Sequence, residues 1–151
     1  MEIKILFGSE TGNSEGLAEG AKKDLQNDGH KVDVLDMTDV TVGDLEKFEN
    51  ILLITSTWGD GEPPTNAQNL YDELEKASSA DLSKLNFAVF AIGQSFYGNF
   101  CKAGEDFDKF FAKYGGKRIM PIETSDDDFD EKFPTWLKEV KTKFPGGDGM
   151  K

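Results

Sequence analysis

The stretch Phe7-Gly8-Ser9-Glu10-Thr11-Gly12-Asn13-Ser14 joins an apolar run, residues 3–7, to an amphipathic one. The apolar run predicts a strand, and one face of the following predicted helix carries Leu17, Ala18, Ala21 and Leu25. Glycines, hydroxyls and an amide at a helix N-terminus offer N–H donors and the positive end of the helix dipole, which together bind an anion, most often phosphate. No Lys or Arg lies between Lys4 and Lys22, which excludes the nucleoside-triphosphate loop ending in Gly-Lys-Ser/Thr. The stretch therefore predicts a site for the phosphate monoester of a tightly held cofactor.

Composition excludes several classes of protein. The 151 residues carry 29 acidic and 17 basic side chains, a net charge of −12, so a nucleic-acid partner is not expected. Arg118 is the only arginine, which argues against phosphoryl transfer with an arginine clamp. One Cys and one His make no usual zinc site, and the acidic run 126–131 lacks the spacing of a calcium loop, so no metal is expected. The lone Cys suits the reducing cytoplasm, and no apolar run is long enough for membrane insertion.

Strand and helix patterns alternate along the whole chain, as in a parallel sheet covered on both faces. Residues 51–54 and 87–92 are continuous apolar runs typical of central strands, whereas residues 32–36 alternate and residues 118–122 contain a proline, as edge strands do. The sequence thus predicts an α/β fold, a three-layer doubly wound sandwich with a five-stranded parallel sheet of order 2-1-3-4-5. A single domain over residues 1–145 and a flexible tail over 146–151 are expected.

Local signals place the later helices. A capping box is predicted at residues 65–68, ahead of an amphipathic helix. A second helix is predicted to end at Gly115-Gly116, and a third to carry Pro134 in its first turn. Cys101 is interpreted as a small residue that opens a helix rather than as a reactive thiol.

Ligands of such a sheet bind beyond the carboxyl ends of the strands, where the strand order reverses. Residues 8–14, 55–65 and 93–101 should therefore converge. Trp58 and Tyr97 lie in glycine-rich turns, where no helical or strand periodicity would place them in a core. Two aromatic side chains beside a phosphate-binding segment predict a slot for a flat ring with a phosphate tail. Taken alone, Trp58 is as consistent with a local plug or an anchor for a partner as with ligand binding. Residues 9–14 alone are also consistent with an ordinary helix cap.

Together the segments resemble those of short-chain flavodoxins, from near the start of the chain to about Phe144. The matching motifs are Ser9-Glu10-Thr11-Gly12-Asn13-Ser14, Ser56-Thr57-Trp58-Gly59-Asp60 and Gly93-Gln94-Ser95-Phe96-Tyr97-Gly98-Asn99-Phe100-Cys101. Residues 59–67 and 99–101 also resemble the FMN domains of diflavin reductases. No long insertion follows Ile122, unlike in the long-chain members of the family.

The resemblance implies FMN as cofactor, with its phosphate on residues 9–14 and its ring between Trp58 and Tyr97. The peptide of Gly59 would flip to accept a hydrogen bond from the ring. Many relatives carry Asp at the position of Gln94, and losing that charge should make the second reduction step only about 20–35 mV less negative. The implied cofactor-binding residues are Ser9, Glu10, Thr11, Gly12, Asn13, Ser14, Ser56, Thr57, Trp58, Gly59, Asp60, Gly93, Gln94, Ser95, Tyr97, Asn99, Phe100 and Cys101.

The expected function is that of a low-potential one-electron carrier that uses the semiquinone/hydroquinone couple of FMN. It would be a cytoplasmic monomer without catalytic residues of its own. Its acidic surface would steer the basic faces of redox proteins, such as a flavodoxin or ferredoxin reductase and low-potential acceptors. Two alternatives remain: a flavin-dependent quinone reductase, and a dedicated donor resembling the FMN domain of a diflavin reductase. A phosphate-receiving signalling domain is disfavoured, because Gly8-Ser9 stand where its acidic pair would be.

Overall fold

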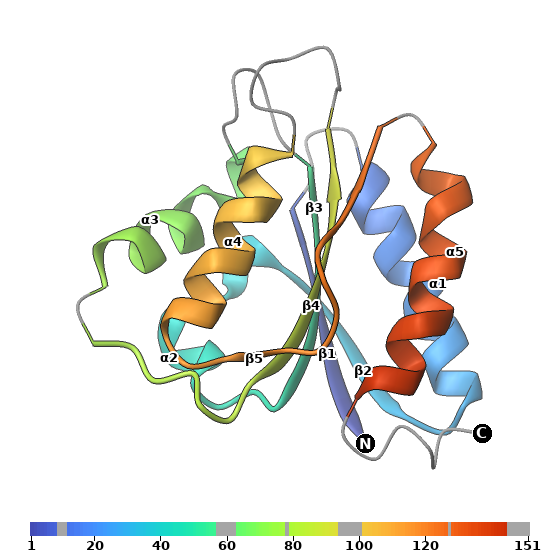
Figure 1. Cartoon of the computed structure of the whole chain (residues 1–151), viewed down its shortest axis with the longest axis horizontal. Coiled ribbons are helices and arrows are strands. Elements are labelled where there is room, and N and C mark those ends of the chain that lie inside the picture. Colours follow the sequence, from blue (N-terminus) through green and yellow to red (C-terminus); the bar gives the residue numbers. More distant parts are fainter. Residues whose placement is uncertain (9–11, 57–62, 78, 94–100, 127, 145–151) are drawn as a thin grey trace.

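Parallel strands and helices alternate along the chain (Figure 1). The computed structural model describes residues 1–8, 12–56, 63–77, 79–93, 101–126 and 128–144. The strands are β1 (Glu2–Gly8), β2 (Lys31–Asp36), β3 (Asn50–Ser56), β4 (Asn86–Ile92), β5 (Lys117–Arg118) and β6 (Glu123–Ser125). The α-helices are α1 (Asn13–Asn27), α2 (Val42–Leu45), α3 (Gln68–Lys76), α4 (Lys102–Lys113) and α5 (Phe129–Lys143), and the 3₁₀ turns are η1 (Met37–Asp39) and η2 (Thr65–Ala67).

The sheet order is β2-β1-β3-β4-β5, with β6 also paired to β4. This confirms the predicted doubly wound order, in which the strand order reverses between the neighbouring strands β1 and β3. Helices α1 and α5 cover one face of the sheet, and α3 and α4 cover the other (Figure 1). None of the helices in the described part of the chain is long and apolar enough to span a bilayer.

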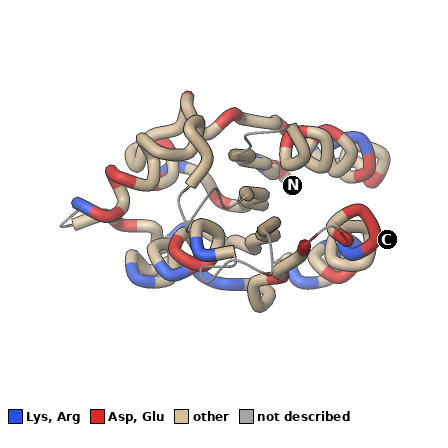
Figure 2. Tube along the Cα trace, turned by 90° about the horizontal axis from the view of Figure 1, so that it is seen from above, with Lys and Arg blue, Asp and Glu red and all other residues tan. Residues whose placement is uncertain are grey.

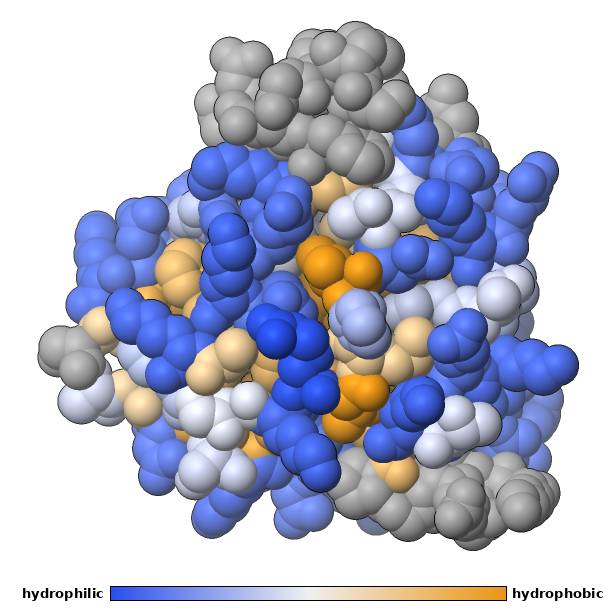
Figure 3. Space-filling model, viewed as in Figure 1, coloured by the Kyte–Doolittle hydropathy of each residue, from blue (hydrophilic) through white to orange (hydrophobic). Residues whose placement is uncertain are grey.

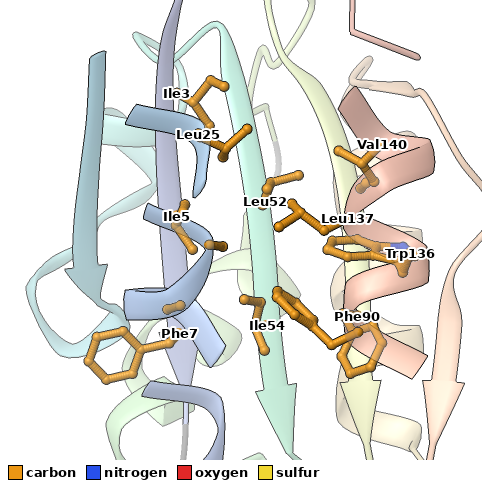
Figure 4. Close-up of a cluster of buried hydrophobic side chains, with 14 of the residues drawn as sticks. Ile3, Ile5, Phe7, Leu25, Leu52, Ile54, Phe90, Trp136, Leu137 and Val140 are labelled. Atoms are coloured by element: carbon orange, nitrogen blue, oxygen red, sulfur yellow. The ribbon is translucent and has the colours of Figure 1, made fainter. Parts of the chain in front are cut away.

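Two cores fill the spaces between these layers, because the central strands are apolar on both faces along most of their length. Alternate side chains of one strand point to opposite faces, so neighbouring residues enter different cores. Toward α1 and α5 point Ile3, Ile5, Leu52, Ile54 and Phe90, which meet Leu25, Trp136, Leu137 and Val140 (Figure 4). Toward α3 and α4 point Leu6, Ile51, Leu53, Phe87 and Val89. The buried central strands were predicted from their continuous apolar runs.

The edge strand differs from the prediction. Residues 118–122 were expected to form one strand, but β5 ends at Arg118 and β6 begins at Glu123. The amide of Lys117 donates to the carbonyl of Leu85, the residue before β4, at 2.7 Å, and the amide of Ile119 donates to Phe87 of β4 at 2.9 Å. The next residue in this alternation is Pro121, which has no N–H to donate. Arg118 lies opposite Phe87, and Glu123 lies opposite Phe90. The edge therefore advances five residues over a distance that β4 covers in three, which leaves two extra residues on the edge. The interruption is therefore a bulge centred on the proline.

The interrupted edge leaves a small groove against α5. Its volume is about 250 Å³, and its walls include Met120, Pro121, Ile122 and Trp136. The face that carries this edge shows a narrow apolar area between hydrophilic residues (Figure 3).

Two helix starts also differ from the prediction. Pro134 is the sixth residue of α5 rather than a first-turn residue, because the helix begins one turn earlier, at Phe129. The predicted capping box at residues 65–68 does not cap α3, whose N-cap is Ala67 without a side-chain cap. The amide of Ala67 bonds the carbonyl of Pro64 at 2.8 Å, which closes η2 before the α-helix can start.

Candidate functional site

Three strands end side by side at one edge of the sheet, where the predicted binding segments begin. Gly8 of β1 lies opposite Thr55 of β3, and Ser56 of β3 lies opposite Ile92 of β4. The segments that follow Gly8, Ser56 and Gly93 therefore leave the sheet from neighbouring positions, at the top of the molecule as drawn in Figure 1. The predicted convergence of the three segments is confirmed at their described ends.

The four longer helices begin at this same edge, because each returns antiparallel to the strand before it (Figure 1). Their first-turn N–H groups and the positive ends of their dipoles thus face one region. The N-caps of α1 and α4 are Gly12 and Cys101, and neither provides a side-chain cap. Both N-caps adopt left-handed backbone conformations, with φ of 88° and 57°. The edge is therefore suited to an anionic group.

Ser14 provides the most direct evidence for a ligand at this edge. It is the second residue of α1 and fully buried, yet its Oγ has no hydrogen-bond partner among the described residues. An unpaired buried hydroxyl costs about 1–3 kcal/mol, so native proteins rarely keep one without a reason. A phosphate oxygen at this helix start would accept this hydrogen bond. The described residues thus fit the phosphate of FMN.

Close packing beneath the edge brings the helices up to the strand ends. A Cβ on Gly8 would come within 3.0 Å of both the Ala67 Cβ and the Thr55 Oγ1, so only glycine lets η2 approach the end of β1 this closely. On α4, a Cβ on Gly104 would lie 2.5 Å from the Ala91 Cβ.

Cys101 lies at the start of α4, as predicted for a small residue that opens a helix. It is fully buried, and burial raises the pKa of its thiol to about 11. A thiol with this pKa stays protonated at neutral pH, so it is a poor nucleophile. Its Sγ lies 3.7 Å from the carbonyl oxygen of Ser125, to which it can donate a weak hydrogen bond.

Ser125 was not predicted as a site residue, although it is fully buried beside this edge on β6. Its carbonyl also accepts a 2.9 Å hydrogen bond from the amide of Gly93. A three-residue strand has no periodicity to reveal a buried position, so the sequence holds no signal for Ser125 apart from its place after the fifth predicted strand.

Acidic side chains border the edge. They occupy the first turns of three helices, at Glu15 of α1, Glu105 of α4, and Asp130 and Glu131 of α5. Figure 2 views the molecule from this side, with acidic residues in red. Acidic side chains in the first turn stabilise a helix through its dipole, and they make the rim of this edge negative.

The predicted site residues divide into two groups. Those within the described residues are all placed at this edge: Gly12, Asn13, Ser14, Ser56, Gly93 and Cys101. The others lie outside the described residues: Ser9, Glu10, Thr11, Thr57, Trp58, Gly59, Asp60, Gln94, Ser95, Tyr97, Asn99 and Phe100. The tail 146–151 also lies outside them.

The fold and the edge define a doubly wound α/β protein whose strand ends are suited to an anionic ligand. The family model for flavodoxin matches residues 5–136, and the chain belongs to the flavodoxin family. Its cofactor is FMN, and it is an electron-transport flavoprotein.

Individual relatives agree with this assignment. The chain is 42% identical to the sulfite reductase [NADPH] flavoprotein alpha-component of Bacillus subtilis over 92% of its own length, and 38% identical to that of Zymomonas mobilis over 91%. It spans 23% of the length of each of these relatives. A flavodoxin structure from Streptococcus pneumoniae has a TM-score of 0.79 and 30% identity, and covers 95% of this chain and 99% of its own. Oxidised flavodoxin 2 from Bacillus cereus has a TM-score of 0.82 and 28% identity, over 95% of this chain and all of its own.

Proposed function

We propose that this chain is a low-potential one-electron carrier that shuttles electrons between larger redox enzymes. The observation that supports it most is the Ser14 hydroxyl, which has no hydrogen-bond partner among the described residues and lies at the start of α1, where β1, β3 and β4 end. Bound FMN supplies the redox chemistry. The protein contributes binding, orientation and an electrostatic environment, and its negative rim disfavours adding electrons, which keeps the potential low.

The binding site in this proposal keeps the residues implied by the family resemblance. Residues 9–14 would hold the phosphate, with Ser14 donating its hydroxyl hydrogen. Trp58 and Tyr97 would cover the two faces of the ring. The backbone of Cys101, at the start of α4, would lie beside the pyrimidine edge of the ring. Because the N-cap of α4 has no side-chain cap, its first turn is available to such a ligand.

A second candidate is a dedicated donor for one enzyme, and the relatives favour it. The relatives with 42% and 38% identity are flavoprotein components of sulfite reductase, although the chain spans less than a quarter of their length. The two candidates share the cofactor and differ in partner range. In either case, we expect the acidic rim to attract basic faces of redox partners. A cytoplasmic monomer and a single domain over residues 1–145 remain part of the proposal, and the free, buried Cys101 suits a reducing compartment.

Anaerobic photoreduction of the FMN-reconstituted protein tests the proposal. We expect a transient blue species with long-wavelength absorbance, followed by complete bleaching, because a one-electron carrier must stabilise its half-reduced form. Direct bleaching without this species would contradict the proposal and favour a quinone reductase, as would rapid oxidation of NAD(P)H without added reductase.

Stopped-flow reduction of several low-potential acceptors separates the two candidates. A general carrier should reduce acceptors of different families at similar rates, and these rates should fall as ionic strength rises. A dedicated donor should reduce a sulfite reductase hemoprotein much faster than the others.

A further inference from the structure

Ser125 contacts three residues at the binding edge. Its hydroxyl donates to the carbonyl oxygen of Ala91 at 2.9 Å. Its own carbonyl oxygen accepts from the amide of Gly93 at 2.9 Å and lies 3.7 Å from the Sγ of Cys101. Gly93 follows the last residue of β4 and Cys101 precedes the first residue of α4. One buried residue of β6 thus contacts both the end of a strand and the start of the next helix.

We propose that Ser125 is a positioning residue for FMN, which sets the separation between Gly93 and Cys101. This inference rests on the proposed function, in which the backbone of both residues borders the cofactor. Ser125 does not touch the cofactor in this proposal. It acts through the two residues that its carbonyl oxygen contacts.

The backbone of Cys101 shows why the start of α4 needs such support. Its φ of 57° is the one left-handed value of a non-glycine residue among the described residues. This conformation costs about 1–2 kcal/mol for a residue with a Cβ, and it persists where the surroundings hold it in place. The contact with Ser125 and the complete burial of the side chain provide that support. A shift at Ser125 should therefore be transmitted to the first turn of α4.

The packing of α4 against β4 adds a second link between the start of this helix and Ser125. Gly104, three residues after Cys101, packs against Ala91, the residue whose carbonyl accepts from Ser125. On its other side, α4 is held by Asp106, which accepts hydrogen bonds from Tyr71 of α3 at 2.5 Å and from Lys102 at 2.6 Å. This second attachment joins two helices and does not involve the strand ends. Tyr71 therefore offers a matched control.

The test compares Ser125→Ala, Cys101→Ala and their double variant with Tyr71→Phe. Titration of the apoproteins with FMN, followed by flavin fluorescence, gives the dissociation constants, and visible circular dichroism reports the surroundings of the bound ring. We expect each single variant to raise the dissociation constant three- to tenfold and to alter the visible spectrum. The double variant should lose less than the product of the two single effects, because the Ser125 hydroxyl and the Cys101 thiol both act by holding the backbone of Ser125 in place. Tyr71→Phe should stay within twofold of the wild type and leave the spectrum unchanged.

A purely structural role predicts a different result. If Ser125→Ala and Cys101→Ala lowered the free energy of unfolding but left the dissociation constant and the spectrum unchanged, the inference would be overturned. The same holds if Tyr71→Phe produced equal changes in binding. Failure of the wild-type protein to bind FMN would contradict the proposed function itself. Amide exchange of Gly93 in the apoproteins would then still report the contact, with faster exchange expected in Ser125→Ala.

Discussion

Gly104 of α4 and Ala91 of β4 are in such close contact that a Cβ on residue 104 would lie 2.5 Å from the Cβ of Ala91. Real Cβ atoms do not approach this closely, so the helix can pack at this distance only because residue 104 is glycine. The contact lies in the first turn of α4, at the edge that we propose for the cofactor. The position of α4 is therefore coupled to that of β4 at the proposed cofactor site.

Replacing Gly104 with alanine should destabilise the protein by about 1–3 kcal/mol, because overpacking outweighs the helix propensity that alanine gains. Gly20→Ala on α1 is the matched control, since nothing lies within 4 Å of a Cβ added there. The control should be more stable than wild type by about 0.5–1 kcal/mol. Urea unfolding of both variants measures the difference, and a stabilised Gly104→Ala would contradict the packing described here.

Replacing Ser14 with alanine should weaken FMN binding without destabilising the apoprotein. The hydroxyl has no partner among the described residues, so its removal costs no hydrogen bond in the apoprotein. A hydrogen bond to a charged phosphate contributes about 1.5–3 kcal/mol, so the dissociation constant should rise by about tenfold or more. Ser79→Ala, at an exposed position, should change neither quantity. Unchanged FMN affinity in Ser14→Ala would remove Ser14 from the phosphate site.

Breaking the Asp108–Arg118 pair should destabilise the link between α4 and β5. Arg118 donates to both carboxylate oxygens of Asp108, at 3.0 and 2.6 Å, and its guanidinium lies 5.7 Å from the centre of the Phe87 ring. The Asp108 side chain is only 9% exposed, whereas that of Arg118 is 39% exposed. We therefore expect Arg118→Ala to cost about 1–3 kcal/mol, less than for a fully buried pair.

A double replacement shows where that cost arises. Leucine at both positions 108 and 118 should be less destabilising than Arg118→Ala alone, since no buried charge is then left unpaired. Urea unfolding of both variants provides the comparison. A double variant that is clearly the less stable of the two would indicate that the ion pair itself contributes most of the stability.

Alkaline pH should destabilise the fold through Cys101. Burial raises the pKa of its thiol from 9.0 to about 11, so between these values the unfolded state has lost the proton and the folded state has kept it. The unfolded state then binds fewer protons, and the free energy of unfolding falls as pH rises from 9 to 11. Urea unfolding at pH 8, 9 and 10 should show a smaller fall for Cys101→Ala than for wild type. Parallel curves for the two proteins would show that Cys101 does not contribute.

Much of the fold could be predicted from the sequence, because continuous apolar runs such as residues 87–92 occur where a strand is buried on both faces. The edge strand could be predicted only in part. Pro121 indicated an edge position, but the two extra residues between Arg118 and Glu123 depend on the pairing register with β4, which residue types alone do not specify. Pro134 was placed wrongly because the acidic residues before it can start the helix one turn earlier.

The candidate site was predicted from motifs, and tertiary contacts were missed. Ser14 was identified because its hydroxyl lies in a recognisable helix start. Ser125 and Gly104 were missed because their roles depend on contacts with residues that are distant in the sequence, such as Ala91. No local sequence pattern indicates such contacts. The roles of Trp58 and Tyr97 stay predictions, since both lie outside the described residues.

The interrupted edge also limits the addition of another chain at this side of the sheet. An exposed edge strand has unpaired backbone N–H and C=O groups that can pair with another chain, and long flat edges lead to aggregation. Here β5 has two residues and β6 three, a proline lies between them, and Lys117 and Arg118 carry positive charge. No uninterrupted ladder of this edge is long enough to serve as a template for fibril growth, so Pro121 makes this edge a poor site for aggregation.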